Sequence, residues 1–338
     1  MGPVAGKPGG QYKRGSPHWL WCAVPDSEDI CERFWNLPSK PREEARRERL
    51  FLDDVIQKAH LEREIASRLG GVHTILDAGG GTGRFSIPLA RQGFHVTHLD
   101  ISQGMIDAAR HLAQDAGVLD RMRFERGRVG DLGQYAEGTF DLVICCDAPI
   151  SYTYPDQIRT IAELTRVAAQ ALVISVSSRL GYMPYAFNPL QKQQYFTDPA
   201  SELPDVQRYL GQTDLSSFVP DLDSGWRALT SGILGDRERV EQEYAAGRAP
   251  WPRNYLFMPE ELRKILVGTG VRDVRLSGPG ALARSIPNEV LRTLLLNDDY
   301  RGRFLDLCYE FDSNPAVCGL GKDNLVASGL RPSDFRSP

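Results

Sequence analysis

The residues best suited to chemistry in this 338-residue chain stand close together, between Thr74 and Met105. A short apolar run leads to Asp77, glycines fill positions 79, 80, 81 and 83, and a second apolar run ends on Asp100. Because glycine has no Cβ, a turn this rich in glycine lets the backbone approach a ligand closely. A carboxylate such as Asp100 accepts hydrogen bonds from ligand hydroxyl groups. The stretch therefore predicts a site for a nucleotide-type ligand.

The order of patterns around these residues indicates how they are positioned. An apolar run (74–76), the glycine turn, a helix-like stretch (85–91) and an alternating run (94–99) follow one another. Strand, tight turn, helix and strand in this order are typical of the first βαβ unit of a parallel sheet. Ligands of such sheets bind beyond the carboxyl ends of the strands, where the turn and Asp100 are both expected.

The glycine spacing argues against a dinucleotide. That fingerprint is G-x-G-x-x-G, in which the third glycine lets the helix pack closely on the strand. Counting from Gly79, the third glycine of the fingerprint is replaced by Arg84. Counting from Gly80, the second is replaced by Thr82, and counting from Gly81, the third is replaced by Ser86. With no pyrophosphate to hold, a nucleoside with a cationic amino-acid tail is a suitable ligand. The pattern present is Asp77-x-Gly79-x-Gly81-x-Gly83.

Three segments together resemble the class I S-adenosylmethionine-dependent methyltransferases. They are LDAGGGTGRF, LDIS with Asp100 followed by Met105, and GTFDLVICCDAP, and the resemblance runs from about Arg63 to Ser178. It implies an α/β fold: a Rossmann-like, doubly wound, mostly parallel seven-stranded sheet with an antiparallel edge pair at its C-terminal end. It also implies S-adenosyl-L-methionine as cofactor and S-adenosyl-L-homocysteine as product.

The resemblance further implies roles for individual residues. Asp100 would accept the ribose hydroxyls, Ile101 and Met105 would flank the adenine, and Asp131 would bind the adenine amino group. The glycines would let the backbone approach the methionine portion. The full cofactor-binding set expected is Asp77, Gly79, Gly81, Gly83, Asp100, Ile101, Met105, Asp131, Leu132 and Cys146.

The loop after the apolar run 140–146 holds the catalytic candidates. That run is typical of a central parallel strand buried on both faces, and in the similar enzymes the following loop lines the transferred methyl group. Asp147 and Tyr152 could act as a base or orienting group, although packing in the core is the commoner role of a tyrosine. The loop is not of the N-P-P-Y type, which lowers the expectation of a DNA or glutamine substrate.

Five segments are expected along the chain. They are a disordered tail (1–16), an N-terminal helical lid (17–71), the cofactor-binding core (72–178), an insertion after the fifth strand that covers the active site (179–258), and a C-terminal completion with the last two strands (259–338). One helix is predicted from Pro41 to Leu69, with Arg42, Arg46, Arg47 and Arg49 on a solvated face. Apolar residues 18–24 and 182–195 are predicted to form a gating lid.

Composition limits the partners. The net charge of −4 and pI near 5.9 argue against a nucleic-acid partner. No apolar run long enough to span a membrane, and no signal peptide, is present, so a cytoplasmic enzyme without a membrane partner is expected. The six cysteines match no metal-binding spacing, so they are interpreted as buried small side chains and no metal is predicted. The oligomeric state is left open.

The leading hypothesis is methylation of a small molecule, such as an intermediate of specialised metabolism. The alternative is a cyclase, in which the amine of the cofactor attacks its own Cγ and gives azetidine-2-carboxylate and methylthioadenosine. A non-catalytic cofactor-binding protein is the third. The motifs would bind the same cofactor in all three cases, so they do not separate them.

Overall fold

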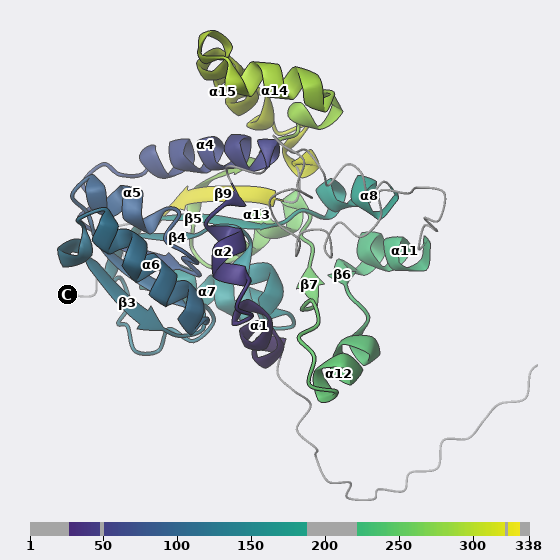
Figure 1. Ribbon diagram of the computed structural model, residues 1–338, viewed down its shortest axis with the longest axis horizontal. Helices are drawn as coiled ribbons and strands as arrows, with labels where there is room; N and C mark the ends of the chain where they lie inside the picture. Colours follow the sequence, from purple (N-terminus) through teal and green to yellow (C-terminus); the bar gives the residue numbers. More distant parts are fainter. Residues whose placement is uncertain (1–26, 48–50, 188–221, 322–323, 332–338) are drawn as a thin grey trace, which may run out of the picture.

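The computed structural model describes residues 27–47, 51–187, 222–321 and 324–331 (Figure 1). Its helices are α1 (Ser27–Trp35), α2 (Lys40–Glu44), α4 (Leu52–Ala66), α5 (Ser86–Arg91), α6 (Gln103–Asp115), α7 (Gln157–Val167), α8 (Arg179–Phe187), α11 (Leu222–Ser231), α12 (Arg237–Ala245), α13 (Pro259–Gly268), α14 (Asn288–Leu296) and α15 (Asp298–Asp312). Its strands are β1 (Thr74–Ala78), β2 (His95–Asp100), β3 (Met122–Arg126), β4 (Phe140–Cys145), β5 (Ala168–Ser177), β6 (Ile233–Leu234), β7 (Asn254–Tyr255), β8 (Arg272–Ser277) and β9 (Asn324–Leu330).

Seven strands form the central sheet in the order β3-β2-β1-β4-β5-β9-β8. The first five are parallel, and β9 runs antiparallel to both β5 and β8. This order confirms the predicted Rossmann-like sheet with an antiparallel pair at its end. Ala78 pairs with Leu99, so the turn after β1 and Asp100 at the end of β2 reach the same edge of the sheet.

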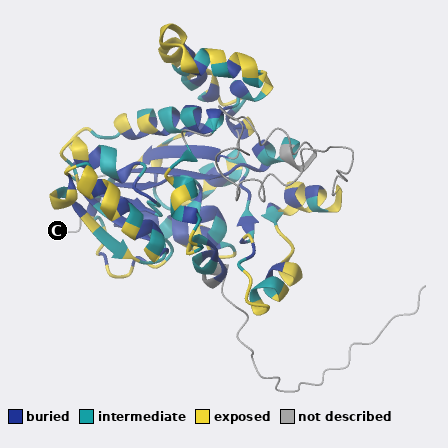
Figure 2. Ribbon diagram, in the orientation of Figure 1, coloured by how far each residue is buried: buried dark blue, intermediate teal, exposed yellow. Residues whose placement is uncertain are grey.

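The strands of the sheet are largely buried (Figure 2), and their apolar side chains belong to two cores. On one face, Leu76 and its neighbours pack against α7 and α13. On the other, Ile75 and its neighbours pack against α4, α5 and α6. Alternate strand residues point to opposite faces, so the near-continuous apolar runs of β1 and β4 fit strands buried on both sides. The helices α14 and α15 form a third cluster with the N-terminal end of α4.

Most of the predicted elements are found within a few residues of their predicted ends. The predicted helix over 41–69 is wrong as a single helix. α2 ends at Glu44, and Phe51, immediately before α4, has extended backbone angles (φ −114°, ψ 123°). Residues 45–51 contain no glycine or proline, so no helix-breaking residue marks the break in the sequence.

Five cysteines, at positions 31, 145, 146, 308 and 318, are buried free thiols, as predicted. No helix in the described part of the chain has the length and apolar character to cross a membrane. Within the same residues, no group of three histidine, cysteine or carboxylate side chains could hold a metal ion. The predicted lid segment 18–24 and most of 182–195 lie outside the described residues.

Candidate cofactor and active site

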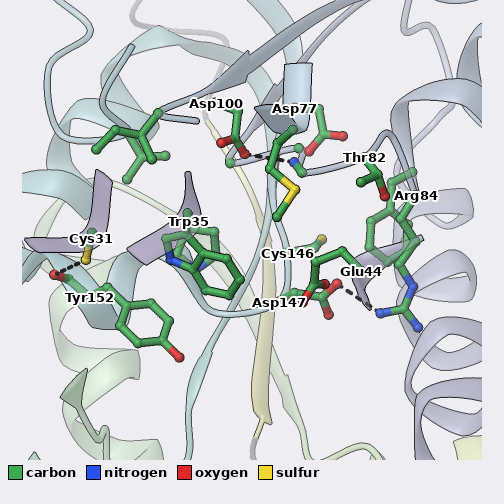
Figure 3. A pocket seen from close by; sticks show the side chains of 18 of the residues that line it. Cys31, Trp35, Glu44, Asp77, Thr82, Arg84, Asp100, Cys146, Asp147 and Tyr152 are labelled. Carbon is green, nitrogen blue, oxygen red and sulfur yellow. Dashed lines mark hydrogen bonds and ion pairs between the residues drawn. The ribbon is translucent and has the colours of Figure 1, made fainter. Parts of the chain in front are cut away.

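A cavity opens at the carboxyl ends of β1, β2 and β4, and its empty space, including the open mouth, is about 980 Å³. The elements that surround it are the turn after β1, the end of β2, the loop after β4, and the N-terminal segment with α1 and α2 (Figure 3). The cavity therefore occupies the position that the sequence predicted for the ligand.

The glycine turn presents its backbone to the cavity. Gly79 and Gly81 have φ angles of +78° and +55°, which favour glycine. The N–H groups of Gly79 and Gly80 both donate to the carbonyl of Leu99, which ties the turn to β2. A Cβ on Gly81 would meet no protein atom within 4 Å, because that side of the residue faces open space. Gly83 does not line the cavity; a Cβ there would lie 2.8 Å from Ile87 of α5.

Asp100 lies beneath this turn with spare hydrogen-bonding capacity. Its Oδ2 accepts the N–H of Gly81 and its Oδ1 that of Ser102, both at 2.8 Å. A carboxylate accepts about four hydrogen bonds, so Asp100 keeps capacity for a ligand beside these two bonds and the contact of the Ile101 amide. Burial raises the pKa of Asp100 to about 6, although the Ser102 and Gly81 amides oppose this rise.

Asp77 is a second buried carboxylate at the cavity, only 1% exposed. The hydroxyl of Ser86, the first residue of α5, donates to its Oδ2. Burial raises the pKa of Asp77 to about 7, and the nearby carboxylates of Asp100 and Asp147 add to the rise. A positively charged ligand beside Asp77 would therefore favour the ionised form of this carboxyl group.

Asp147 begins the loop after β4 in a left-handed conformation, with φ of +63°. Its Oδ2 accepts from Nη1 of Arg84 at 2.9 Å, and its Oδ1 from Nε2 of Gln57 at 2.9 Å. Burial would raise the pKa of Asp147, but the Arg84 and Arg47 guanidinium groups outweigh it and hold that pKa below its ordinary value. A carboxylate with a lowered pKa is a weak proton acceptor, so this geometry suits an orienting role better than that of a base.

The expectation that Arg47 lies on a solvated face is wrong. Its guanidinium donates to both oxygens of Asp54, at 2.9 and 3.1 Å, and to Glu44 at 2.9 Å. Its Nη1 also lies 3.8 Å from Oδ2 of Asp147, and Arg47 and Glu44 both line the cavity. The acid partners come from α2, α4 and the loop after β4, so no local pattern in the sequence could show the pairing. Arg42 is exposed, as predicted.

Aromatic rings form the rim of the cavity opposite the glycine turn. Trp35, at the end of α1, and Tyr152 both line it, with ring centroids 6.2 Å apart. Trp251 packs behind both, at 6.4 Å from Trp35 and 6.1 Å from Tyr152, and contacts Phe34 at 4.8 Å. All four contacts are edge-to-face, the arrangement that aromatic rings favour. The insertion after β5 therefore reaches this rim through Trp251.

The structure brings most of the predicted cofactor residues together. Those that line the cavity are Asp77, Gly79, Gly81, Asp100, Ile101, Met105 and Cys146, with the candidate catalytic residues Asp147 and Tyr152. Asp131 is exposed and Leu132 is fully buried in the core, and neither lines the cavity. Arg128 and Val129, just before them, do line it. Contact of Asp131 with adenine thus stays a prediction.

Comparison with known proteins identifies the domain that builds this site. Residues 75–171 match the family model described as a methyltransferase domain. Over this segment the chain matches a methyltransferase domain, in agreement with its resemblance to the class I, S-adenosylmethionine-dependent enzymes. S-adenosylmethionine is the cofactor that this match indicates.

Relatives of the methyltransferase domain match over the same part of the chain. A magnesium-protoporphyrin O-methyltransferase of Rhodobacter capsulatus is 36% identical over 114 residues, which are 32% of this chain and 47% of that protein. A tRNA 5-carboxymethoxyuridine methyltransferase of Escherichia coli K12 is 32% identical over 118 residues, 35% of this chain and 42% of that protein. The chain thus spans less than half the length of these curated relatives. The crystal structure of magnesium protoporphyrin IX methyltransferase from Synechocystis PCC 6803 with bound S-adenosylhomocysteine gives a TM-score of 0.49 at 17% identity, covering 90% of this chain and 100% of that one.

The residues of the methyltransferase domain fit this cofactor. The open side of Gly81 leaves room that a Cβ would fill, and Asp100 keeps free lone pairs at the right end of β2 for a ribose diol. Asp77 supplies buried negative charge for a ligand that carries positive charge. Ile101 and Met105 present apolar surface of the kind that a purine ring contacts.

Proposed function

We propose that the protein transfers the methyl group of S-adenosylmethionine to a small-molecule acceptor. The observation that carries the proposal is the joining of two features in one cavity: a glycine turn with Asp100 beneath it, and an aromatic rim built by Trp35 and Tyr152. The first holds a nucleoside, and the second offers apolar surface for another molecule. The names of the relatives, which include a magnesium-protoporphyrin O-methyltransferase and a demethylmenaquinone methyltransferase, support a small acceptor.

When bound, the cofactor supplies a methyl group on a sulfonium, which a nucleophile attacks in line with the carbon–sulfur bond. The protein's share is to position the two molecules and exclude water, which can supply much of the rate enhancement. Asp100 fixes the ribose, and the backbone at Gly79–Gly81 approaches the methionine portion. The rim of Trp35, Tyr152 and Trp251 covers the reacting centre. Asp147, fixed by Arg84, orients a polar group of the acceptor rather than accepting its proton.

We place the part of the insertion around Trp251 over the acceptor side of this cavity, together with Trp35 of α1, and α2 with Arg47 over the cofactor side. Trp251 supports the first placement, because it packs against two rings of the rim. Glu44 and Arg47 support the second, because both line the cavity. An enclosed acceptor site of this kind suits a small molecule, such as an intermediate of specialised metabolism, better than a polymer.

The product nucleoside tests the proposal. The protein is incubated with S-adenosylmethionine alone and with a panel of phenols, carboxylic acids and amines, and the nucleosides are separated by chromatography. We expect S-adenosylhomocysteine only when a suitable acceptor is present. Methylthioadenosine formed without an acceptor would instead demonstrate the cyclase. Tight binding with no product from any acceptor would favour the non-catalytic protein.

A further inference from the structure

Three buried polar side chains form a chain beneath the glycine turn. Ser86 donates its hydroxyl to Asp77, and the same oxygen lies 2.9 Å from Nδ1 of His98 on β2. Asp77 is 1% exposed, and Ser86 and His98 are fully buried. Nε2 of His98 has no hydrogen-bond partner within the described part of the chain. Asp77 alone of the three reaches the cavity.

The imidazole of His98 also supports the turn sterically. A Cβ built on Gly80 would lie 2.5 Å from both Cε1 and Nδ1 of His98, so the ring fills the space directly beneath this glycine. The ring also packs against that of Phe124 on β3, with centroids 5.4 Å apart, and contacts the backbone of Gly81, which by itself would raise the pKa of His98. Burial lowers the pKa of His98 to about 4, so the ring is neutral near pH 7. A leucine or methionine could fill this space without burying two ring nitrogens, so the polar ring needs another explanation.

Counting hydrogens shows what the imidazole provides. When Asp77 is ionised, Ser86 donates to it and Nδ1–H of His98 donates to Ser86, so two polar hydrogens serve two contacts. When Asp77 is protonated, three polar hydrogens share the same two contacts. The third must remain at the buried Nε2 of His98 or point from Asp77 into the cavity. The chain is thus fully matched only around an ionised Asp77.

We propose that Ser86 and His98 are positioning residues for the Asp77 carboxylate, and that binding of the cationic cofactor expels the proton from Asp77. The inference rests on the cofactor site of the proposed function and adds a linkage between proton and cofactor. The proton leaves to solvent, and the carboxylate that remains accepts from Ser86 and faces the positive charge of the ligand. By linkage, protonation and cofactor binding then oppose each other by the same factor.

The groups around Asp77 favour its protonated form when no cation is present. Asp100 from β2 and Asp147 from the loop after β4 face it, and both raise its pKa. Cys145 and Cys146 of the β4 end also lie near, but burial raises the pKa of both thiols, so they stay neutral. With its pKa raised to about 7, Asp77 is about half protonated at neutral pH in the free protein.

Calorimetric titration of the full chain with S-adenosylmethionine, between about pH 5.5 and 8.5, tests the linkage. Parallel titrations in two buffers with different ionisation enthalpies count the protons released. We expect affinity to rise with pH through about 7, so that it is about tenfold weaker one pH unit below the midpoint, with close to a full proton released there. The ligand's amino group itself loses a proton at about pH 8, so only the acid limb is diagnostic.

Substitutions test whether the fall in cofactor affinity at low pH comes from protonation of Asp77. Asp77→Asn keeps the acceptor for Ser86 but cannot titrate, so it should abolish the step near pH 7. Asp100→Asn, the control at the other buried carboxylate, should weaken binding and keep a step, moved to lower pH because a charge that raises the pKa of Asp77 is gone. Ser86→Ala should move the midpoint to higher pH, because the ionised form loses a hydrogen bond.

A pair of substitutions tests His98. His98→Asn places an amide N–H where Nδ1–H stands and should keep the wild-type midpoint, whereas His98→Leu should move it upward as Ser86→Ala does. Thermal unfolding checks that each variant is folded. The number of protons released by the wild type tests the inference even if a variant does not fold. The inference is overturned if the wild-type affinity does not change from pH 6 to 7.5, or if the step survives in Asp77→Asn. Neither result contradicts the proposed function. No binding of S-adenosylmethionine at any pH overturns the proposed function with it.

Discussion

The two long walls of the cavity are built in different ways. One, the turn wall, consists of Gly79–Gly81 and Asp100, and its contacts are mainly backbone N–H groups held within one βαβ unit. The other, the charged wall, consists of the side chains of Glu44, Arg47, Arg84 and Asp147, which come from separate parts of the chain. Asp54 lies behind this wall and pairs with Arg47.

Substitutions are therefore expected to act differently in the two walls. In the turn wall, neighbouring residues keep their geometry through φ angles and backbone hydrogen bonds, so a substitution acts mainly by filling ligand space. In the charged wall, each group compensates another in a partly buried setting. Removal of one partner therefore leaves a charge without its counterion, and the cost is to folding as well as to the site.

The largest expected effect breaks the turn wall. Gly81→Val places a branched side chain in the open space of the cavity, and cofactor binding should fall by more than about a hundredfold. Gly93→Val is the control, because Gly93 also has positive φ (+102°) and open space but is exposed between α5 and β2. Both variants place a β-branched residue at a positive φ, so calorimetry should show wild-type affinity only for Gly93→Val. Equal losses in the two would mean that strain, not blocked space, is responsible.

A middle-sized effect is expected in the charged wall. Arg84→Met removes the partner 2.9 Å from Asp147 and leaves Arg47 at 3.8 Å, so the free energy of unfolding should fall by about 2–3 kcal/mol. Arg237→Met removes a comparable pair with Glu241 on the exposed surface of α12 and should change stability by less than about 0.5 kcal/mol. Urea unfolding compares the two. Equal effects would show that partial burial adds nothing to the Arg84 pair.

The direction of the pKa shift of Asp147 determines how the loss of stability in Arg84→Met depends on pH. The pKa of Asp147 is lowered in the folded protein, so its ionisation stabilises the fold above the unfolded pKa of about 3.9. This contribution is lost as pH falls through the folded value. The difference between wild type and Arg84→Met should thus be largest near neutral pH and shrink below about pH 4. A difference that grows in acid would contradict the pairing.

The turn wall was predictable because its signals are local. The alternating run of β2, the glycine positions and the acid at its end lie within about one βαβ unit, and the order of elements determines which sheet edge they share. The charged wall was not predictable, since the sequence gives no sign that Arg47 turns inward to reach Asp54 and Asp147. The lining role of Trp35 was not predicted, because its partners Tyr152 and Trp251 are distant in sequence.

The smallest expected effect concerns the aromatic rim that joins the two walls. Trp251 does not line the cavity, but it packs edge-to-face behind Trp35 and Tyr152, so it limits how far these rings can move. Aromatic pairs contribute about 0.5–1.5 kcal/mol each beyond their buried area, and only part of this is expected to change on binding. Trp251→Ala should thus weaken S-adenosylmethionine binding by about threefold to tenfold, mainly through faster dissociation, because a looser rim opens more often. Trp226→Ala is the matched control, since Trp226 is 68% exposed on α11. Stopped-flow displacement measures both dissociation rates, and an unchanged rate for Trp251→Ala would show that the rim is rigid without its outer ring.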